Sequence, residues 1–400
     1  MPEIAEKIIK DKISFEMPGS PTEVPDEKQI IRAQFKSTPG FVQMMDEYIS
    51  DMPERVFKPV DFNFEGATVP AEWIGEKFAE YSTVPVKKRL VPVAEDIRRR
   101  LDSQIPSWRE PPKSNAVLRE LNKMLAIKSG IMLYRDFYKT AGSEKMFVMP
   151  EKNMLEWDDV FPFIYLMAAF EGIDSDTDAK HLVIDEMQDY TPVQYEVLNM
   201  VYPCRKTILG DFGQMINPCH VHTLNDMKTI YEGAEFAELN RSYRSTYEIM
   251  SYANAVCRQP RIEMIERHGS KPQKKGFDSE TDEVTYIVER LSEFEESESG
   301  SMDIIIKSEK DAEKLFDIIS QRHDVNFVCK DSASYLGGVN ILGVQMAKGL
   351  EFDEVLVPGA NRDRYNKEHD RNVLYVAFTR AMHRLTVTYS GEPSQFLPDC

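Results

Sequence analysis

Hydrophobic residues follow a helical spacing up to about residue 170 and then gather into short continuous runs. In the first part they recur every three to four residues, which is typical of amphipathic helices. The predicted helices cover Thr38–Met52, Trp73–Tyr81, Val93–Leu101, Ser114–Ile127 and Asn153–Phe170. Residues 1–40 are rich in Pro, Glu and Lys, so we predict an extended or poorly ordered lead-in there.

After Asp178 the apolar runs alternate with helical patterns. Leu182–Ile184 has no polar alternation, which predicts a strand buried on both faces. A helix beginning at Pro192 follows, and then a second predicted buried strand at Thr207–Leu209. This strand–helix–strand order predicts a parallel βαβ unit. A further helix is predicted over 240–255.

The remainder repeats the alternating pattern. Helices are predicted over 284–294, 310–319 and 373–382, and strands over 302–307, 325–329, 339–345, 353–359 and 385–390. Two α/β parts therefore follow one helical region, and the predicted fold class is α/β.

The composition narrows the possible partners. The chain has 400 residues, enough for two or three domains, and a formal charge of −18. Proteins whose main contact is duplex phosphate usually carry the opposite sign, so a nucleic-acid site must be local. Basic clusters at 87–89 and 98–100 are consistent with either a solvated helix face or a patch that follows phosphates.

Location and redox state follow from what the sequence contains. The apolar stretches are short and the first residues have no signal-peptide pattern, so we expect a cytoplasmic protein without membrane contact. The cysteines are scattered, which favours free thiols; they are Cys204, Cys219, Cys257, Cys329 and Cys400. Cys219, His220 and His222 lack a second ligand group, so zinc is not favoured.

Two adjacent carboxylates, Asp185 and Glu186, end the first predicted strand. Parallel sheets place ligands at the carboxyl ends of their strands. By themselves these residues fit a solvated strand end as well as a reactive pair.

Five blocks in order resemble the motifs of UvrD/Rep-type superfamily 1 helicases: DEMQD (185–189), GDFGQMI (210–216), LNRSYRST (239–246), VQMAKGLEFDEVLV (344–357) and LYVAFTRAMHRL (374–385). The resemblance covers residues 155–400 closely. It implies tandem RecA-like P-loop NTPase domains, the first incomplete, after a mostly helical insertion-type region. We therefore expect the insertion-like region at 1–155, the C-terminal part of the first RecA-like domain at 156–238, and the second at 239–400.

The resemblance also implies ATP and Mg²⁺ as cofactors and gives residues roles. Asp185 would hold Mg²⁺, and Glu186 would activate the water that attacks ATP. Gln214 would sense the γ-phosphate, and Arg244 and Arg380 would be arginine fingers. Tyr243 would stack on adenine, Gly349 would offer an amide to phosphate, and Glu351 would bind ribose.

The sequence departs from the family at the phosphate-binding loop. No glycine in the chain is followed by lysine, so GxxxxGK[ST] is missing. We therefore expect a missing N-terminal segment or partner chain, no appreciable ATPase, and an incomplete first sheet that exposes apolar surface. Gln214 is also not followed by the aromatic residue that stacks on single-stranded DNA in relatives, which resembles the helicase IV/HelD branch.

Two functions remain open on these grounds. The chain is either part of an ATP-dependent DNA helicase or translocase acting on single-stranded or forked DNA, or a non-catalytic motor scaffold. The scaffold would bind RNA polymerase or a nucleic-acid assembly.

Overall fold

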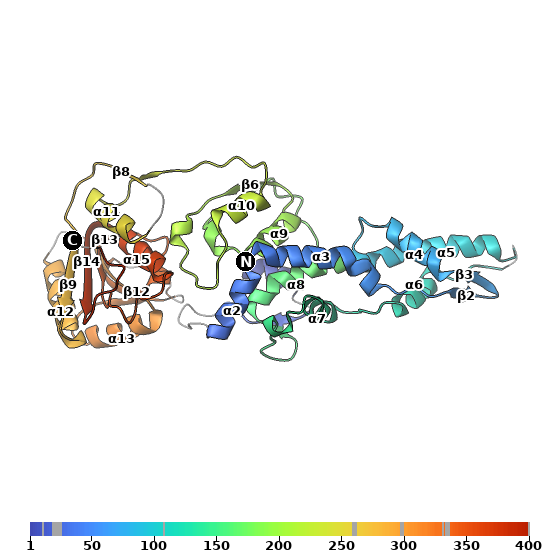
Figure 1. Ribbon diagram of the computed structural model, residues 1–400, viewed down its shortest axis with the longest axis horizontal. Coiled ribbons are helices and arrows are strands. Elements are labelled where there is room, and N and C mark those ends of the chain that lie inside the picture. Colours follow the sequence, from blue (N-terminus) through green and yellow to red (C-terminus); the bar gives the residue numbers. More distant parts are fainter. Residues whose placement is uncertain are drawn as a thin grey trace.

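The computed structural model describes residues 1–9, 12–17, 26–106, 109–257, 262–296, 300–329, 332 and 337–398. A helical arm extends from one end of a central helical and α/β region, and a second α/β unit forms the other end (Figure 1). None of the helices in these ranges is long and apolar enough to cross a membrane.

The N-terminal region is mostly helical, as predicted. Its helices are α1 (Pro2–Ile9), α2 (Glu27–Lys36), α3 (Pro39–Val56), α4 (Ala71–Glu80), α5 (Leu90–Gln104), α6 (Ser114–Lys123), α7 (Gly130–Thr140) and α8 (Trp157–Phe170). Their apolar faces form one core that also takes in Val193 and Val197. This core therefore extends across residue 155 into the following α/β part.

The lead-in prediction was wrong for the described part of residues 1–40. α1 and α2 are helices because their apolar faces find partners: Ala5 and Ile9 are buried in the N-terminal core, and Ala33 of α2 is also buried. Asp26 caps α2 through a capping box with Gln29. The predicted extended stretch also covers residues 10–11 and 18–25, which lie outside the described residues.

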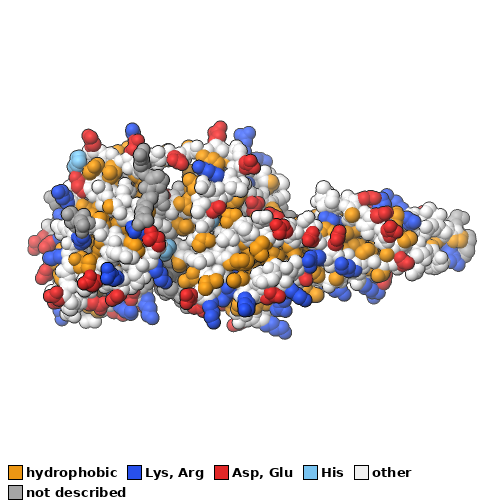
Figure 2. All heavy atoms as spheres, viewed as in Figure 1, with side chains coloured by type: hydrophobic (Ala, Val, Ile, Leu, Met, Phe, Trp, Pro, Cys, Tyr) orange, Lys and Arg blue, Asp and Glu red, His pale blue; other side chains and the backbone are white. Residues whose placement is uncertain are grey.

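The arm consists of a hairpin and three helices. Strands β2 (Phe62–Phe64) and β3 (Ala67–Val69) pair antiparallel, and α4, α5 and α6 pack beside them (Figure 1). On the face shown in Figure 2, acidic and basic side chains interleave along the arm. A short parallel pair, β1 (Ser14–Phe15) with β4 (Met154–Leu155), joins the chain start to the segment before α8.

The first α/β unit has the predicted βαβ order. β5 (His181–Ile184) and β6 (Arg205–Ile208) pair in parallel, connected by α9 (Pro192–Val201), and α10 (Leu224–Ile230) follows. Ile184 packs with Tyr195, Leu198 and Met227 on one face.

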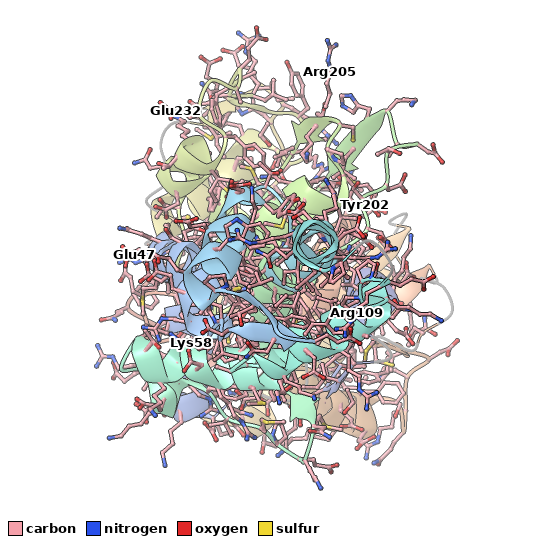
Figure 3. All side chains as sticks on the ribbon, turned by 90° about the vertical axis from the view of Figure 1, so that its right-hand side faces the viewer. Glu47, Lys58, Arg109, Tyr202, Arg205 and Glu232 are labelled. Atoms are coloured by element: carbon pink, nitrogen blue, oxygen red, sulfur yellow. The ribbon has the colours of Figure 1, made fainter. Side chains whose placement is uncertain are left out.

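The prediction from the apolar runs that both strands are buried was wrong, whereas the exposed apolar surface expected from the absent phosphate-binding loop is present. Val183 is 61% exposed and Leu209, just after β6, is 48% exposed. In the described residues the sheet has only these two strands, so one face and both outer edges lack a cover. Arg205 at the start of β6 points away from the body (Figure 3).

The second α/β unit is built around a six-stranded parallel sheet. The strand order among the described residues is β11 (Asn326–Val328), β12 (Gly338–Gly343), β10 (Ser301–Ile306), β13 (Phe352–Val357), β14 (Ala381–Ser390) and β9 (Gln273–Phe277). α11 (Tyr247–Val256) and α15 (Asp370–Thr379) cover one face. α12 (Glu280–Glu295) and α13 (Glu309–Ile319) cover the other. Alternate side chains of β10 enter the two cores, as a doubly covered parallel sheet requires.

The helix predicted over 240–255 begins later, at Tyr247. Residues 232–241 are exposed, and β7 (Arg241–Ser242) pairs with β8 (Glu263–Met264). This segment spans the distance between the two α/β units (Figure 1), which an α-helix at 1.5 Å per residue would cover less well than extended chain.

Candidate functional site

The carboxyl end of β5 presents the predicted acidic pair. Asp185 is exposed and accepts a hydrogen bond from the backbone N–H of Glu186, at 2.8 Å. Glu186 adopts a left-handed conformation with φ 53°. This conformation turns the chain sharply between the strand and the short helix η3 (Met187–Asp189).

Gln188 fixes the Glu186 carboxylate from within the same unit. Its side chain is fully buried, and its amide donates to Glu186 Oε2 at 2.5 Å. The amide oxygen of Gln188 accepts from the backbone N–H of Asp211 at 3.0 Å. A Cβ at Gly210 would lie 2.5 Å from that oxygen, so only glycine fits beside it. The ends of β5 and β6 are thereby tied together.

Gln214 connects the two α/β units. It lies in the short helix η4 (Phe212–Gln214), where its amide donates to Asp211 Oδ2 at 3.1 Å and its oxygen accepts from Arg380 at 3.2 Å. Arg380 is 2% exposed and also donates to the carbonyls of Val376 and Leu350. Burial, and then the neighbouring Arg244, lower the pKa of Arg380.

Lys348 forms a second link between the units. It follows the short helix α14 (Val344–Ala347) and places its ammonium 2.6 Å from Asp189 and 3.4 Å from Glu186. Glu186 and Asp189 therefore share one cation, the Lys348 ammonium. Among the described residues, no group of three or more His, Cys, Asp or Glu side chains could hold a metal ion.

Arg244 and Glu351 form an ion pair on the second unit. Both lie within electrostatic reach of Arg380, as does Glu186. The structure thus brings together five predicted residues: Glu186, Gln214, Arg244, Glu351 and Arg380.

Three predicted residues stand at the margin of this cluster. Tyr243 is 63% exposed and interacts with Arg241. Gly349 has φ 83°, a left-handed conformation that favours glycine, directly after Lys348. Asp185 points to solvent.

Most basic side chains of the clusters at 87–89 and 98–100 make hydrogen bonds, ion pairs or aromatic contacts within the fold. Arg89 is buried and donates to the carbonyls of Val84 and Ser82, and Arg100 stacks over Trp73 at 4.5 Å. Lys87 pairs with Glu171 at 2.9 Å. The remaining exposed arginines pair with acidic residues on their own helix. These contacts favour the solvated-face interpretation over a phosphate-binding patch.

The sequence analysis missed Lys348 and Gln188. Both lie inside the quoted blocks, DEMQD and VQMAKGLEFDEVLV, so the blocks marked the right segments. The partners of Lys348 are set by the packing of one unit against the other, and those of Gln188 by the pairing of β5 with β6. Spacing along the chain contains no signal for either.

Comparison with known proteins finds similarity to proteins named DNA helicases. Residues 338–388 match the family model described as UvrD-like helicase C-terminal domain. The ATP-dependent DNA helicase srs2 of Schizosaccharomyces pombe is 28% identical over 186 residues, which cover 44% of this chain and 20% of that protein. A protein named a probable DNA helicase from Mycoplasma pneumoniae is 24% identical over 253 residues, covering 54% of this chain and 46% of that protein.

One solved structure, the C-terminal domain of a possible DNA helicase from Lactobacillus plantarum, is 30% identical. The match covers 39% of this chain and 92% of that domain, with a TM-score of 0.34. The chain spans less than half the length of the two curated relatives described above. Its C-terminal part is related to UvrD-like helicases.

Proposed function

We propose that this chain, whose C-terminal part is related to UvrD-like helicases, is part of the ATP-driven motor of a superfamily 1 DNA helicase or translocase. The observation that carries the proposal is the meeting of Glu186, Gln214 and Arg380 from two α/β units. Motors of this kind need charge from one unit to reach a ligand held by the other, because closure then depends on the ligand.

Each residue has a role that its surroundings support. Glu186, held by Gln188, would orient and deprotonate the attacking water. Asp185 would hold Mg²⁺, because a carboxylate is a preferred ligand of that ion and this one is exposed. Arg380 and Arg244 would stabilise developing phosphate charge, with Gln214 reporting the state of the ligand to both units. Tyr243, Gly349 and Glu351 would bind the nucleoside and phosphates of ATP.

We further propose that the first RecA-like domain, residues 156–238, is incomplete, and that 239–400 is the second and 1–155 an insertion-type region. The two-stranded β5–β6 sheet with exposed Val183 supports this division. A segment or partner chain carrying a phosphate-binding loop would supply what GxxxxGK[ST] supplies in such motors, and the branch would be helicase IV/HelD-like. The partner nucleic acid would be single-stranded or forked DNA.

The experiment is an ATPase assay on the purified 400-residue chain with and without single-stranded DNA. We expect nucleotide binding that weakens in Arg380→Ala, with no appreciable turnover. Glu186→Gln is the matched control, since it removes the charge and keeps the shape. Mg²⁺-dependent turnover that Glu186→Gln abolishes would contradict the predicted inactivity. Unaltered nucleotide binding in Arg380→Ala would contradict the site.

The second candidate is a non-catalytic scaffold that binds RNA polymerase or a nucleic-acid assembly. The uncovered face of the β5–β6 sheet favours it, because exposed apolar strands commonly receive a partner. Undetectable binding of any nucleotide to the intact chain, combined with a stable complex with RNA polymerase, would favour this function over the motor.

A further inference from the structure

A junction loop, residues 215–222, follows Gln214 and contacts three parts of the molecule. Gln34 at the end of α2 donates to the Pro218 carbonyl at 2.9 Å, and the buried Ser37 accepts from the Val221 N–H at 3.3 Å. On the second α/β unit, His369 bonds to the carbonyl of Ile216 at 2.8 Å and Asn372 to that of Met215 at 3.1 Å. The loop is thus held from the helical region and from both α/β units.

His220 is the residue of the junction loop that reaches the candidate site. Its Nδ1 lies 3.3 Å from the carbonyl oxygen of Gln188, and its Nε2 lies 3.3 Å from the side-chain nitrogen of Asn217. The oxygen of the Asn217 amide accepts from the Cys219 N–H at 3.0 Å, which fixes the amide orientation. Nε2 must therefore accept, so Nδ1 carries the proton and donates to Gln188.

We propose that His220 is a positioning residue for Glu186, acting through Gln188, and that the junction loop connects this contact to α2. The backbone of Gln188 is held by His220 while its side chain holds Glu186 Oε2 and the Asp211 N–H. Removing His220 would free the Gln188 backbone and so loosen the contacts of its side chain with Glu186 and Asp211. Only the chemical role of Glu186 rests on the proposed function; the positioning is a property of the fold itself.

The test is hydrogen exchange of the intact chain at the amides of Asp189 and Asp211. These amides donate to the Glu186 carbonyl and to the Gln188 side chain. We expect His220→Ala to speed their exchange about tenfold, the effect of losing one buried hydrogen bond. His220→Asn keeps a nitrogen donor near the Nδ1 position, so exchange should return to within about twofold of the original rate.

His222→Phe is the matched control in the same loop. The His222 ring packs against Phe212 and His220, and neither of its nitrogens has a hydrogen-bond partner among the described residues. If this change speeds exchange at Asp189 and Asp211 as much as His220→Ala does, general loop packing is responsible and the proposal fails. Unchanged exchange in His220→Ala overturns it as well.

A measurement on the unaltered chain keeps the proposal testable if His220→Ala does not fold. Nitrogen chemical shifts of the His220 ring distinguish the two neutral tautomers. We expect the proton on Nδ1, and a proton on Nε2 would overturn the proposal. Neither readout involves ATP, so a failure of the proposed motor function would leave these results unaffected.

Discussion

Each of the two α/β units contains a strand formed by a short apolar run, but the two strands differ in burial. β10 of the second unit lies between β12 and β13, with helices over both faces, and its last five residues are buried. Among the described strands, β5 of the first unit pairs only with β6, and Val183 is exposed. An apolar run predicts a strand in both cases, but its burial depends on neighbours that other segments must provide.

The largest expected difference lies in hydrogen exchange. Because no described strand pairs with the outer edges of β5 and β6 and their core is small, we expect their amides to exchange about a thousandfold faster than those of β10 and β12. Exchange of the isolated chain followed by mass spectrometry checks this. Equal protection of the two pairs of strands would show that the first sheet is covered in solution. The inferred difference in burial between the two units would then be wrong.

The second largest expected effect is the destabilisation of the first unit by acid. Burial lowers the pKa of His222 from 6.5 to about 4, with His220 adding to the effect. The unfolded chain takes up this proton near pH 6.5, so the stabilisation is complete above that value and is lost as pH falls towards about 4. By about pH 4.5 the loss should reach about 3 kcal/mol.

Urea unfolding across this pH range, followed by circular dichroism, measures the loss. His222→Phe should lose about that much less stability than the unaltered chain over the same range. A parallel decline of the two proteins would show that His222 titrates normally.

The smallest effect comes from a matched pair of substitutions. Val355 of β13 is 2% exposed and Val183 of β5 is 61% exposed. Val355→Ala should lower the free energy of unfolding by about 2 to 3 kcal/mol, because it removes buried methyl groups and leaves a cavity. Val183→Ala should change it by about 0.5 kcal/mol. Urea titration of both variants gives the ratio, and similar losses would mean that Val183 is covered.

Local patterns predicted the elements well where the residues of a helix or strand are themselves enough to specify it. The strands at 301–306 and 352–357 and the helix α3, capped by Thr38, agree with the sequence prediction. Errors arose where a distant segment decides. α1 is helical because it packs against α8. Val183 is exposed because no described strand or helix covers its face.

The candidate site was predictable to the same degree. The motif blocks contain Glu186, Gln214 and Arg380, which the structure brings into one cluster. The roles of Lys348 and His220 depend on contacts across 159 and 32 residues of chain, and no periodic pattern records such contacts.

The left-handed backbone at Glu186 puts stability and activity in opposition. A residue with a Cβ costs about 1 kcal/mol or more in this conformation, whereas glycine adopts it freely. Glycine at position 186 would relieve this backbone cost, but it would leave the buried Gln188 amide without the carboxylate that accepts its hydrogen bond. A change that suits the backbone at this position would therefore remove the residue at the centre of the proposed chemistry.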